Sequence, residues 1–284
     1  MKITTLLENK TTCDALRCEH GLSLYIETAK HKILFDSGAS DAFWENAKAL
    51  GIDLAQVDIA FLSHAHNDHC GGLLTFLRGN RTAKVYLQKE AFGDYYVVTP
   101  TKCAFIGLDP KLHEYADRFV MAEGVTKLDE ELTLFSGIRT HELLSEANAT
   151  LREKVGGDYP RDAFRHEQDL LVTEHGKTVL FAGCAHSGII NIINRAEDIL
   201  GRAPDYVFAG FHLYNPSLGQ SEPRALVDAV GERHAMSPAT APATTLTPGC
   251  TKRWATASPT WRPERPLRSD FLESEQRTWQ TSRR

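Results

Sequence analysis

Residues 62–72, with the sequence LSHAHNDHCGG, constrain this chain more than any other stretch. They bring His64, His66, Asp68 and His69 together within six positions, directly after the apolar run VDIAFL and before a glycine pair. A strand that ends in a short loop places the side chains of that loop at the edge of a sheet, where functional sites are usually built. Imidazole nitrogens and carboxylate oxygens are common ligands of divalent metals. We therefore interpret the segment as half of a metal site rather than as a polar surface loop.

Composition and charge narrow the class of protein to which this chain belongs. The 284 residues are 42% hydrophobic and 24% charged, which is typical of a globular protein with a substantial core. The formal charge of -5 argues against a nucleic-acid-binding surface. No apolar run has the length of a signal peptide or of a membrane span. The six cysteines are scattered along the chain, which favours reduced thiols and a cytoplasmic location.

Strand and helix patterns alternate along the first 230 residues. Strands are expected over 21–28, 31–38, 57–64, 83–88, 131–138 and 204–213, and helices over 40–51, 71–79 and 187–201. Residues 168–183 read as a hairpin with His175 and Gly176 at its turn. Residues 92–118 look irregular, as a lid or an insertion, and 145–165 look like a long polar loop. This order predicts an α/β fold with two sheets packed face to face and helices outside.

A metal needs more ligands than one loop supplies, and three later histidines stand near the ends of expected strands. They are His166, His186 and His212. We predict His186 as a metal ligand and leave His166 and His212 open between a ligand and a packed side chain. Cys184 is interpreted as a small buried thiol, with a thiolate ligand as the alternative. No site role is assigned to the other histidines, which are His20, His31, His113, His141, His175 and His234, nor to Cys13 and Cys18.

The motif HAHNDH, preceded by VDIAFLS and with ILFDSG upstream, resembles the metallo-β-lactamase fold superfamily. The strings EHGLSLYIET, NAKALGIDL, SHAHNDHCGGL, GCAHSGIIN and GFHL further resemble a branch often labelled dihydropterin–ribofuranosylaminobenzene phosphate synthase. The resemblance covers residues 1–230. It implies an αββα sandwich of two mixed β-sheets flanked by helices, with a metal site at one edge.

The resemblance also implies roles for individual residues. His64 and His66 would bind the first of one or two divalent ions, and Asp68 and His69 the second. Asp36 would orient the ligand loop. His166 stands near the position of the next ligand of the superfamily, and Cys184 and His186 stand where a bridging aspartate is usual. The predicted metal ligands are His64, His66, Asp68, His69, His186 and His212. Asp68 and His166 are the predicted catalytic residues, and zinc is preferred over manganese or iron as the metal.

The resemblance does not extend to the last part of the chain. A Gly-His-Cys-Thr-Gly string is expected there, and residues 233–284 instead lack valine and isoleucine and show no clear period. We therefore divide the chain into a domain over 1–232 and an aberrant, disordered tail over 233–284. One hypothesis is that a frameshift near residues 231–237 replaced the native C-terminus, and the alternative is a natural disordered tail. A lost ligand would weaken the second metal site.

These features predict a cytoplasmic metal-dependent enzyme of hydrolase type. A metal-bound hydroxide would attack a small anionic substrate, either phosphorylated or pterin-like. Arg161 and Arg165 either hold its charged group or belong to a solvated loop. The alternatives are a phosphodiesterase or lactonase with the same site, and an inactive metal-binding remnant. We expect no nucleic-acid or membrane partner, and the sequence does not predict the oligomeric state.

Overall fold

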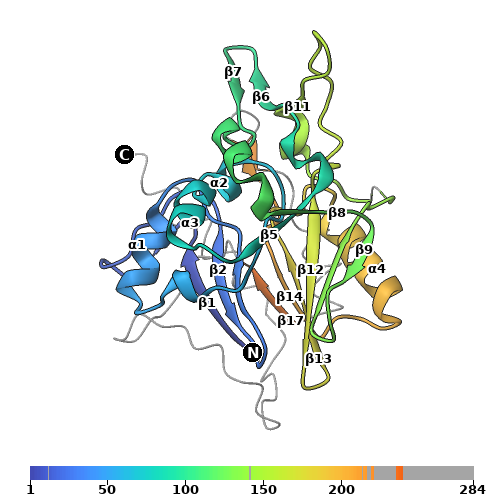
Figure 1. Ribbon diagram of the computed structural model, residues 1–284. Coiled ribbons are helices and arrows are strands. Elements are labelled where there is room, and N and C mark those ends of the chain that lie inside the picture. The colour runs from blue at the N-terminus through green and yellow to red at the C-terminus, as the bar shows by residue number, and fades with distance from the viewer. Residues whose placement is uncertain (12, 141, 213, 216–218, 221–234, 239–284) are drawn as a thin grey trace, which may run out of the picture. The chain divides into compact units, whose positions relative to one another are not determined.

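The computed structural model describes residues 1–11, 13–140, 142–212, 214–215, 219–220 and 235–238. All of them lie in one compact unit, Met1–Trp254. Two six-stranded sheets pack face to face, with α1 and α3 on the outer side of one sheet and α4 on the outer side of the other (Figure 1). The predicted αββα sandwich is therefore confirmed.

The first sheet has the order β1-β2-β3-β4-β5-β8. Its strands are β1 (Lys2–Leu7), β2 (Ser23–Glu27), β3 (Lys32–Phe35), β4 (Ile59–Phe61), β5 (Lys84–Gln88) and β8 (Phe119–Ala122). The strands from β3 to β8 are parallel neighbours, so their carboxyl ends meet at one edge of the sheet. The histidine-rich segment leaves β4 at this edge.

The second sheet has the order β17-β14-β13-β12-β10-β9. Its strands are β9 (Val125–Lys127), β10 (Leu132–Ser136), β12 (Gln168–Glu174), β13 (Lys177–Ala182), β14 (Tyr206–Ala209) and β17 (Ala235–Pro238). The predicted hairpin is β12 and β13, and both turn residues have positive φ, 51° at His175 and 74° at Gly176. Strand β17 lies within the tail predicted over 233–284. The rest of that tail, and with it the frameshift hypothesis, lies outside the described residues.

Three helices cover the sheets: α1 (Ala42–Ala49), α3 (Leu73–Gly79) and α4 (Ile189–Leu200). Gly51 and Gly201 follow α1 and α4 with φ of 70° and 68°, the left-handed conformation that ends a helix readily at glycine. Apolar side chains fill three layers. Leu34, Phe43 and Phe76 lie under α1 and α3, Phe35, Leu170 and Phe181 between the sheets, and Leu180, Ile193 and Val207 under α4.

Two segments are more ordered than their sequence suggested. The stretch 92–118 contains the hairpin β6 (Tyr95–Thr99) and β7 (Lys102–Phe105), and the 3-10 helix Pro110–Arg118. The loop 145–165 contains the 3-10 helix Glu146–Thr150 and β11 (Leu151–Glu153), which pairs with β6. The irregular-loop interpretation of both was wrong, because β11 and β6 form a third, smaller sheet that neither segment forms alone.

None of the helices in the described part of the chain is both long enough and apolar enough to cross a membrane. Cys18, Cys70, Cys103 and Cys184 are free thiols.

Candidate metal centre

Asp36 ties the end of β3 to the histidine-rich loop. Its carboxylate is buried and accepts hydrogen bonds from Ser63 N and Ser63 Oγ, both at 2.7 Å, and from His69 Nδ1 at 2.6 Å. Asp36 has a φ of 58°, an uncommon value for a residue with a side chain. A strained backbone at this position is maintained because three donors converge on the carboxylate. Asp36 therefore fixes both the loop after β4 and the short helix α2 (Asn67–Cys70).

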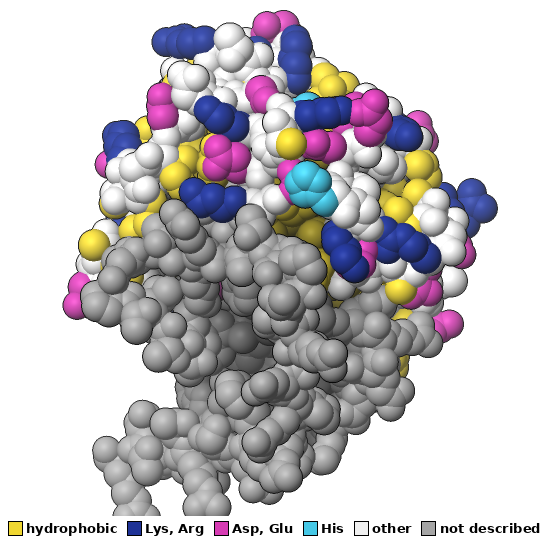
Figure 2. All heavy atoms as spheres, turned by 90° about the horizontal axis from the view of Figure 1, so that it is seen from below, with side chains coloured by type: hydrophobic (Ala, Val, Ile, Leu, Met, Phe, Trp, Pro, Cys, Tyr) yellow, Lys and Arg dark blue, Asp and Glu magenta, His cyan; other side chains and the backbone are white. Residues whose placement is uncertain are grey.

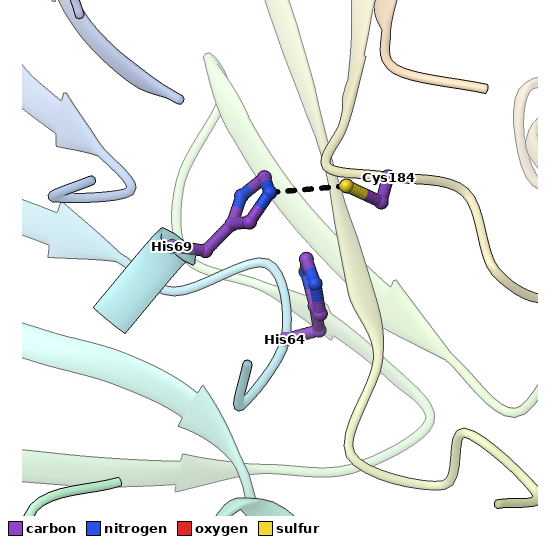
Figure 3. Close-up of side chains that lie close together, drawn as sticks. All are labelled: His64, His69 and Cys184. Atoms are coloured by element: carbon purple, nitrogen blue, oxygen red, sulfur yellow. Dashed lines mark hydrogen bonds between the residues drawn. The ribbon is translucent and has the colours of Figure 1, made fainter. Parts of the chain in front are cut away.

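This arrangement leaves one nitrogen of His64 and one of His69 directed at the centre. His64 Nδ1 lies 2.9 Å from Ser63 Oγ, whose hydroxyl already donates to Asp36, so His64 Nδ1–H is the donor. His64 Nε2 is buried and has no hydrogen-bond partner among the described residues. His69 Nδ1 is held by Asp36, and His69 Nε2 lies 3.0 Å from Cys184 Sγ (Figure 3).

His66 and His186 meet across the two sheets. His66 Nδ1 lies 3.1 Å from His186 Nε2. His186 Nδ1 lies 2.9 Å from the side-chain oxygen of Asn148, which can only accept, so the proton of His186 is on Nδ1. On its other side, His66 Nε2 lies 3.5 Å from Asp162 Oδ2, which favours a proton on that nitrogen. The two nitrogens that face each other are then both acceptors.

The loop after β13 supplies Cys184 and His186. Glu167 accepts from His186 N at 2.7 Å and from Ser187 N at 2.9 Å, which holds the backbone of this loop. Gly183 is needed for close approach, because a Cβ there would lie 2.1 Å from Ser63 Oγ. Ala185, the next residue but one, has a φ of 51°. The loop thus brings Cys184 and His186 against the histidines that follow β4.

His212 joins the centre from the end of β14. Its ring centroid lies 4.4 Å from that of His186, and its φ is 42°. His212 Nε2 is buried and is without a hydrogen-bond partner in the described part of the chain. The uncommon backbone at both Ala185 and His212 indicates that this end of the second sheet is shaped for the site rather than for regular structure.

Donor atoms within 4.8 Å of one another form four sets of three: His64, His66, His186; His64, His69, Cys184; Cys184, His186, His212; and His66, Asp162, His166. A tetrahedral zinc ion with bonds of about 2.0–2.1 Å to nitrogen holds its ligand atoms roughly 3.3 Å apart. The 3.1 Å between His66 Nδ1 and His186 Nε2 is close to that spacing. The buried unpartnered nitrogens and this spacing fit a divalent metal.

A model of the metallo-β-lactamase superfamily matches residues 16–99. Two proteins of Methanocaldococcus jannaschii are similar over most of the chain. The uncharacterized protein MJ0448 is 29% identical over 221 residues, 75% of this chain and 80% of that protein. The second is named 7,8-dihydropterin-6-methyl-4-(beta-D-ribofuranosyl)-aminobenzene-5'-phosphate synthase and is 28% identical over 229 residues, 75% of this chain and 78% of that protein.

Among solved structures, Tm1679 is described as a metal-dependent hydrolase of the β-lactamase superfamily. It superposes with a TM-score of 0.69 and 27% identity, and the match covers 84% of this chain and 87% of Tm1679. The chain thus resembles the metallo-β-lactamase superfamily in both sequence and fold. The resemblance drawn from the sequence, to the superfamily and to the dihydropterin branch, is therefore confirmed.

The two residues predicted as catalytic, Asp68 and His166, border the histidines of the centre. Asp68 is in none of the four donor sets, although its Oδ2 lies 3.6 Å from His69 Nε2 and 3.3 Å from His20 Nε2. His166 has both ring nitrogens engaged: Nδ1 accepts from Ala65 N at 3.0 Å, and Nε2 lies 3.0 Å from Asp162 Oδ2. The catalytic roles of Asp68 and His166 stay predictions.

The sequence interpretation did not include four residues that hold the histidines, namely Ser63, Asn148, Asp162 and Glu167. Ser63 and Glu167 are sequence neighbours of His64 and His166, and Asp162 precedes His166 by four positions. A search for hydroxyl and carboxylate groups beside candidate ligands would have found these three. Asn148 carries no such signal. His141 and His234 lie outside the described residues.

Burial sets the protonation of most histidines in the centre. It lowers the pKa of His64 and His186 well below the ordinary value, and it lowers the pKa of His212 to about 4. These rings are neutral near pH 7, so their lone pairs are available to a metal. His69 differs: burial acts to lower its pKa, but Cys184, Asp68 and Asp36 outweigh burial and raise it. Burial raises the pKa of the Cys184 thiol.

Proposed function

We propose that this protein is a metal-dependent enzyme of hydrolase type that binds one or two divalent ions between its two sheets. The observation that carries the proposal is the 3.1 Å approach of His66 Nδ1 to His186 Nε2. Two buried acceptor nitrogens at that distance repel each other unless a proton or a cation lies between them. Asn148 Oδ1 favours a proton on His186 Nδ1, and Asp162 Oδ2 favours one on His66 Nε2. A cation between the two facing nitrogens therefore explains their approach better than a proton.

His64, His66 and His186 would hold the first ion. His64 and His69 with Cys184 form a second set of donors, and this set suits zinc because a thiolate is a soft ligand. A bound ion would polarise the substrate and lower the pKa of a coordinated water molecule toward about 7. Asp36, Ser63 and Asn148 keep the imidazole protons on the nitrogens that face away from the ions.

The substrate proposed for this centre is small and anionic. The imidazoles of His64, His186 and His212 are neutral, so metal binding adds positive charge beside them, and that charge attracts anions. Phe164 stacks on His186 with ring centroids 4.7 Å apart and an angle of 7°, and offers a flat apolar wall beside the centre. Arg165 is exposed and pairs with Glu153 through two contacts of 2.8 Å, so its charge is already matched.

The similarity to a protein named as a dihydropterin phosphate synthase makes a phosphorylated or pterin-like substrate one candidate. A phosphodiesterase or a lactonase is the alternative with the same centre. Zinc is the preferred ion, and manganese or iron would also suit the nitrogen ligands.

Elemental analysis of the purified full chain, followed by turnover assays, tests the proposal. One or two ions per chain and hydrolysis of bis-p-nitrophenyl phosphate or of an acyl lactone support a hydrolase, and the two substrates separate the alternatives. Metal without turnover of either substrate or of a phosphorylated pterin supports an inactive metal-binding remnant. A chain that binds no zinc, manganese or iron contradicts the proposal.

A further inference from the structure

Asp162 and His166 lie directly behind His66, on the side away from the other histidines. Asp162 Oδ2 is 3.0 Å from His166 Nε2 and 3.5 Å from His66 Nε2, and all three side chains are almost fully buried. Both residues come from the loop that leads from β11 into β12, about a hundred positions after His66.

The carboxylate itself is held in place. Asp162 Oδ1 accepts from Phe164 N at 2.7 Å, the hydrogen bond of an Asx turn. His166 Nδ1 accepts from Ala65 N at 3.0 Å, so His166 carries its proton on Nε2 and donates it to Asp162. The order of donors is therefore Ala65 N–H to His166, and His166 to Asp162.

These hydrogen bonds indicate whether His66 Nε2 carries a proton. A lone pair at that nitrogen would face a buried carboxylate at 3.5 Å, whereas an N–H there is attracted to it. With the proton on Nε2, the lone pair of His66 is on Nδ1, the nitrogen that faces His186. His69 is arranged in the same manner, since Asp36 holds its Nδ1 and leaves Nε2 toward Cys184.

We propose that Asp162, held by His166, is a positioning residue that keeps the proton of His66 on Nε2 and so directs His66 Nδ1 to the metal. His166 then acts through Asp162 and does not touch metal or substrate. The proposal rests on the metal centre of the proposed function, because the lone pair of His66 Nδ1 faces that of His186 Nε2 and a cation between them removes their repulsion.

Nitrogen-15 NMR of the histidine rings in the zinc-loaded full chain, where a cation separates His66 Nδ1 from His186 Nε2, tests the proposal directly. His66 is expected to be protonated at Nε2 and unprotonated at Nδ1. A proton on Nδ1 of His66 in the wild type would overturn the proposal, whatever any variant does. Absence of zinc binding by the wild type would instead contradict the proposed function.

Two substitutions separate the carboxylate from simple packing. In Asp162→Asn, the amide N–H group meets ring nitrogens that already carry protons, so His66 should change tautomer and zinc affinity should fall about 10- to 100-fold. In His166→Gln, the new carbonyl can accept from Ala65 N and the new amide can donate to Asp162. That variant should keep the tautomer of His66 and stay within about threefold of wild-type zinc affinity.

Asp158→Asn, an exposed position on the same loop, is the matched control and should change neither quantity. Zinc affinity is measured by competition with a chromophoric chelator, and circular dichroism checks that each variant is folded. If Asp162→Asn keeps the tautomer of His66 and binds zinc within twofold of wild type, the proposal is wrong. A loss in His166→Gln as large as in Asp162→Asn would also overturn it, because His166 would then act as a ligand.

Discussion

The two ends of the β-sandwich differ in whether their polar side chains have partners. At the end that carries the metal centre, His64 Nε2 and His212 Nε2 are buried and have no hydrogen-bond partner among the described residues. At the opposite end, charged groups are paired and reach water: Asp205 meets Lys177 and Arg202, at 2.7 and 2.8 Å. Figure 2 looks at this second end, where basic and acidic side chains are interspersed.

The backbone shows the same contrast. Asp36, Ala185 and His212 adopt positive φ at the metal-centre end, although none is glycine. The hairpin turn at the other end uses positive φ at His175 and Gly176, a conformation that two-residue turns require. Strain and unsatisfied polarity cost stability, so their concentration around the histidines indicates that this end serves function.

Removal of a ligand at the centre should have the largest effect. In His64→Asn, the first ion loses one of its three predicted nitrogens, and we expect zinc affinity to fall more than about 100-fold, since even residues behind the ligands contribute 10- to 100-fold. The matched control is His175→Asn at the opposite end, where asparagine tolerates the φ of 51°. Equal zinc affinity in the two variants, measured by chelator competition, would contradict the contrast between the ends.

The close approach of the loops at the centre should make Gly183→Ala destabilising by about 1–3 kcal/mol. The added Cβ would lie 2.1 Å from Ser63 Oγ and 3.0 Å from His64 Nδ1, so the hydrogen bond that orients His64 must also shift. Gly157→Ala is the control, because a Cβ there meets nothing within 4 Å. Urea unfolding measures both, and an unchanged free energy of unfolding in Gly183→Ala would show that the loops are not tightly packed.

Cys184→Ser tests whether the second donor set binds metal through sulfur. We expect loss of the sulfur-to-metal charge-transfer absorption of the cobalt-substituted protein and about tenfold weaker binding of the second ion, roughly 1.4 kcal/mol. Cys103→Ser, an exposed free thiol, is the control. A cobalt spectrum that does not change in Cys184→Ser would show that Cys184 is a buried thiol and not a metal ligand.

The smallest effect is expected at the opposite end. The side chain of Asp205 is 17% exposed, and although burial acts to raise its pKa, hydrogen bonds from Lys177, Thr178 N and Arg202 lower it. A lowered folded-state pKa stabilises the protein above the unfolded value of about 3.9 and loses this contribution as the pH falls through the folded value. Asp205→Asn should therefore cost about 1 kcal/mol at pH 7 and progressively less below pH 4.

Urea unfolding of the wild type and of Asp205→Asn between pH 2.5 and 7 measures this cost, and zinc affinity is determined at pH 7. Zinc affinity should not change. A change of tenfold or more in zinc affinity would show that the two ends are coupled, and would weaken the comparison on which these predictions depend.

The local sequence predicted the parts of the fold that local patterns determine. The strands β2 to β5 and the β12–β13 hairpin follow apolar runs, and α4 follows a helical period ended by Gly201. The strand β1 and the β6–β7 hairpin were not predicted. The hairpin is completed by β11, about fifty residues later, and no short-range pattern records that pairing.

The residues of the site also differ in whether the local sequence could predict them. The HxHxDH segment was predictable because its donors are close in sequence. The place of His166 was not, since its Nδ1 accepts from Ala65 N, 101 positions away. A histidine at the start of a buried strand gives the same local pattern whether it binds metal or supports a neighbour, and only the positions of Ala65 and Asp162 distinguish the two.

Anomalous diffraction from crystals of the zinc-loaded full chain tests the central claim most directly. The account predicts an ion about 2.0–2.1 Å from His64 Nε2, His66 Nδ1 and His186 Nε2. An ion bound elsewhere, an ion ligated by Asp162 and His166, or no ion between the two sheets would contradict it.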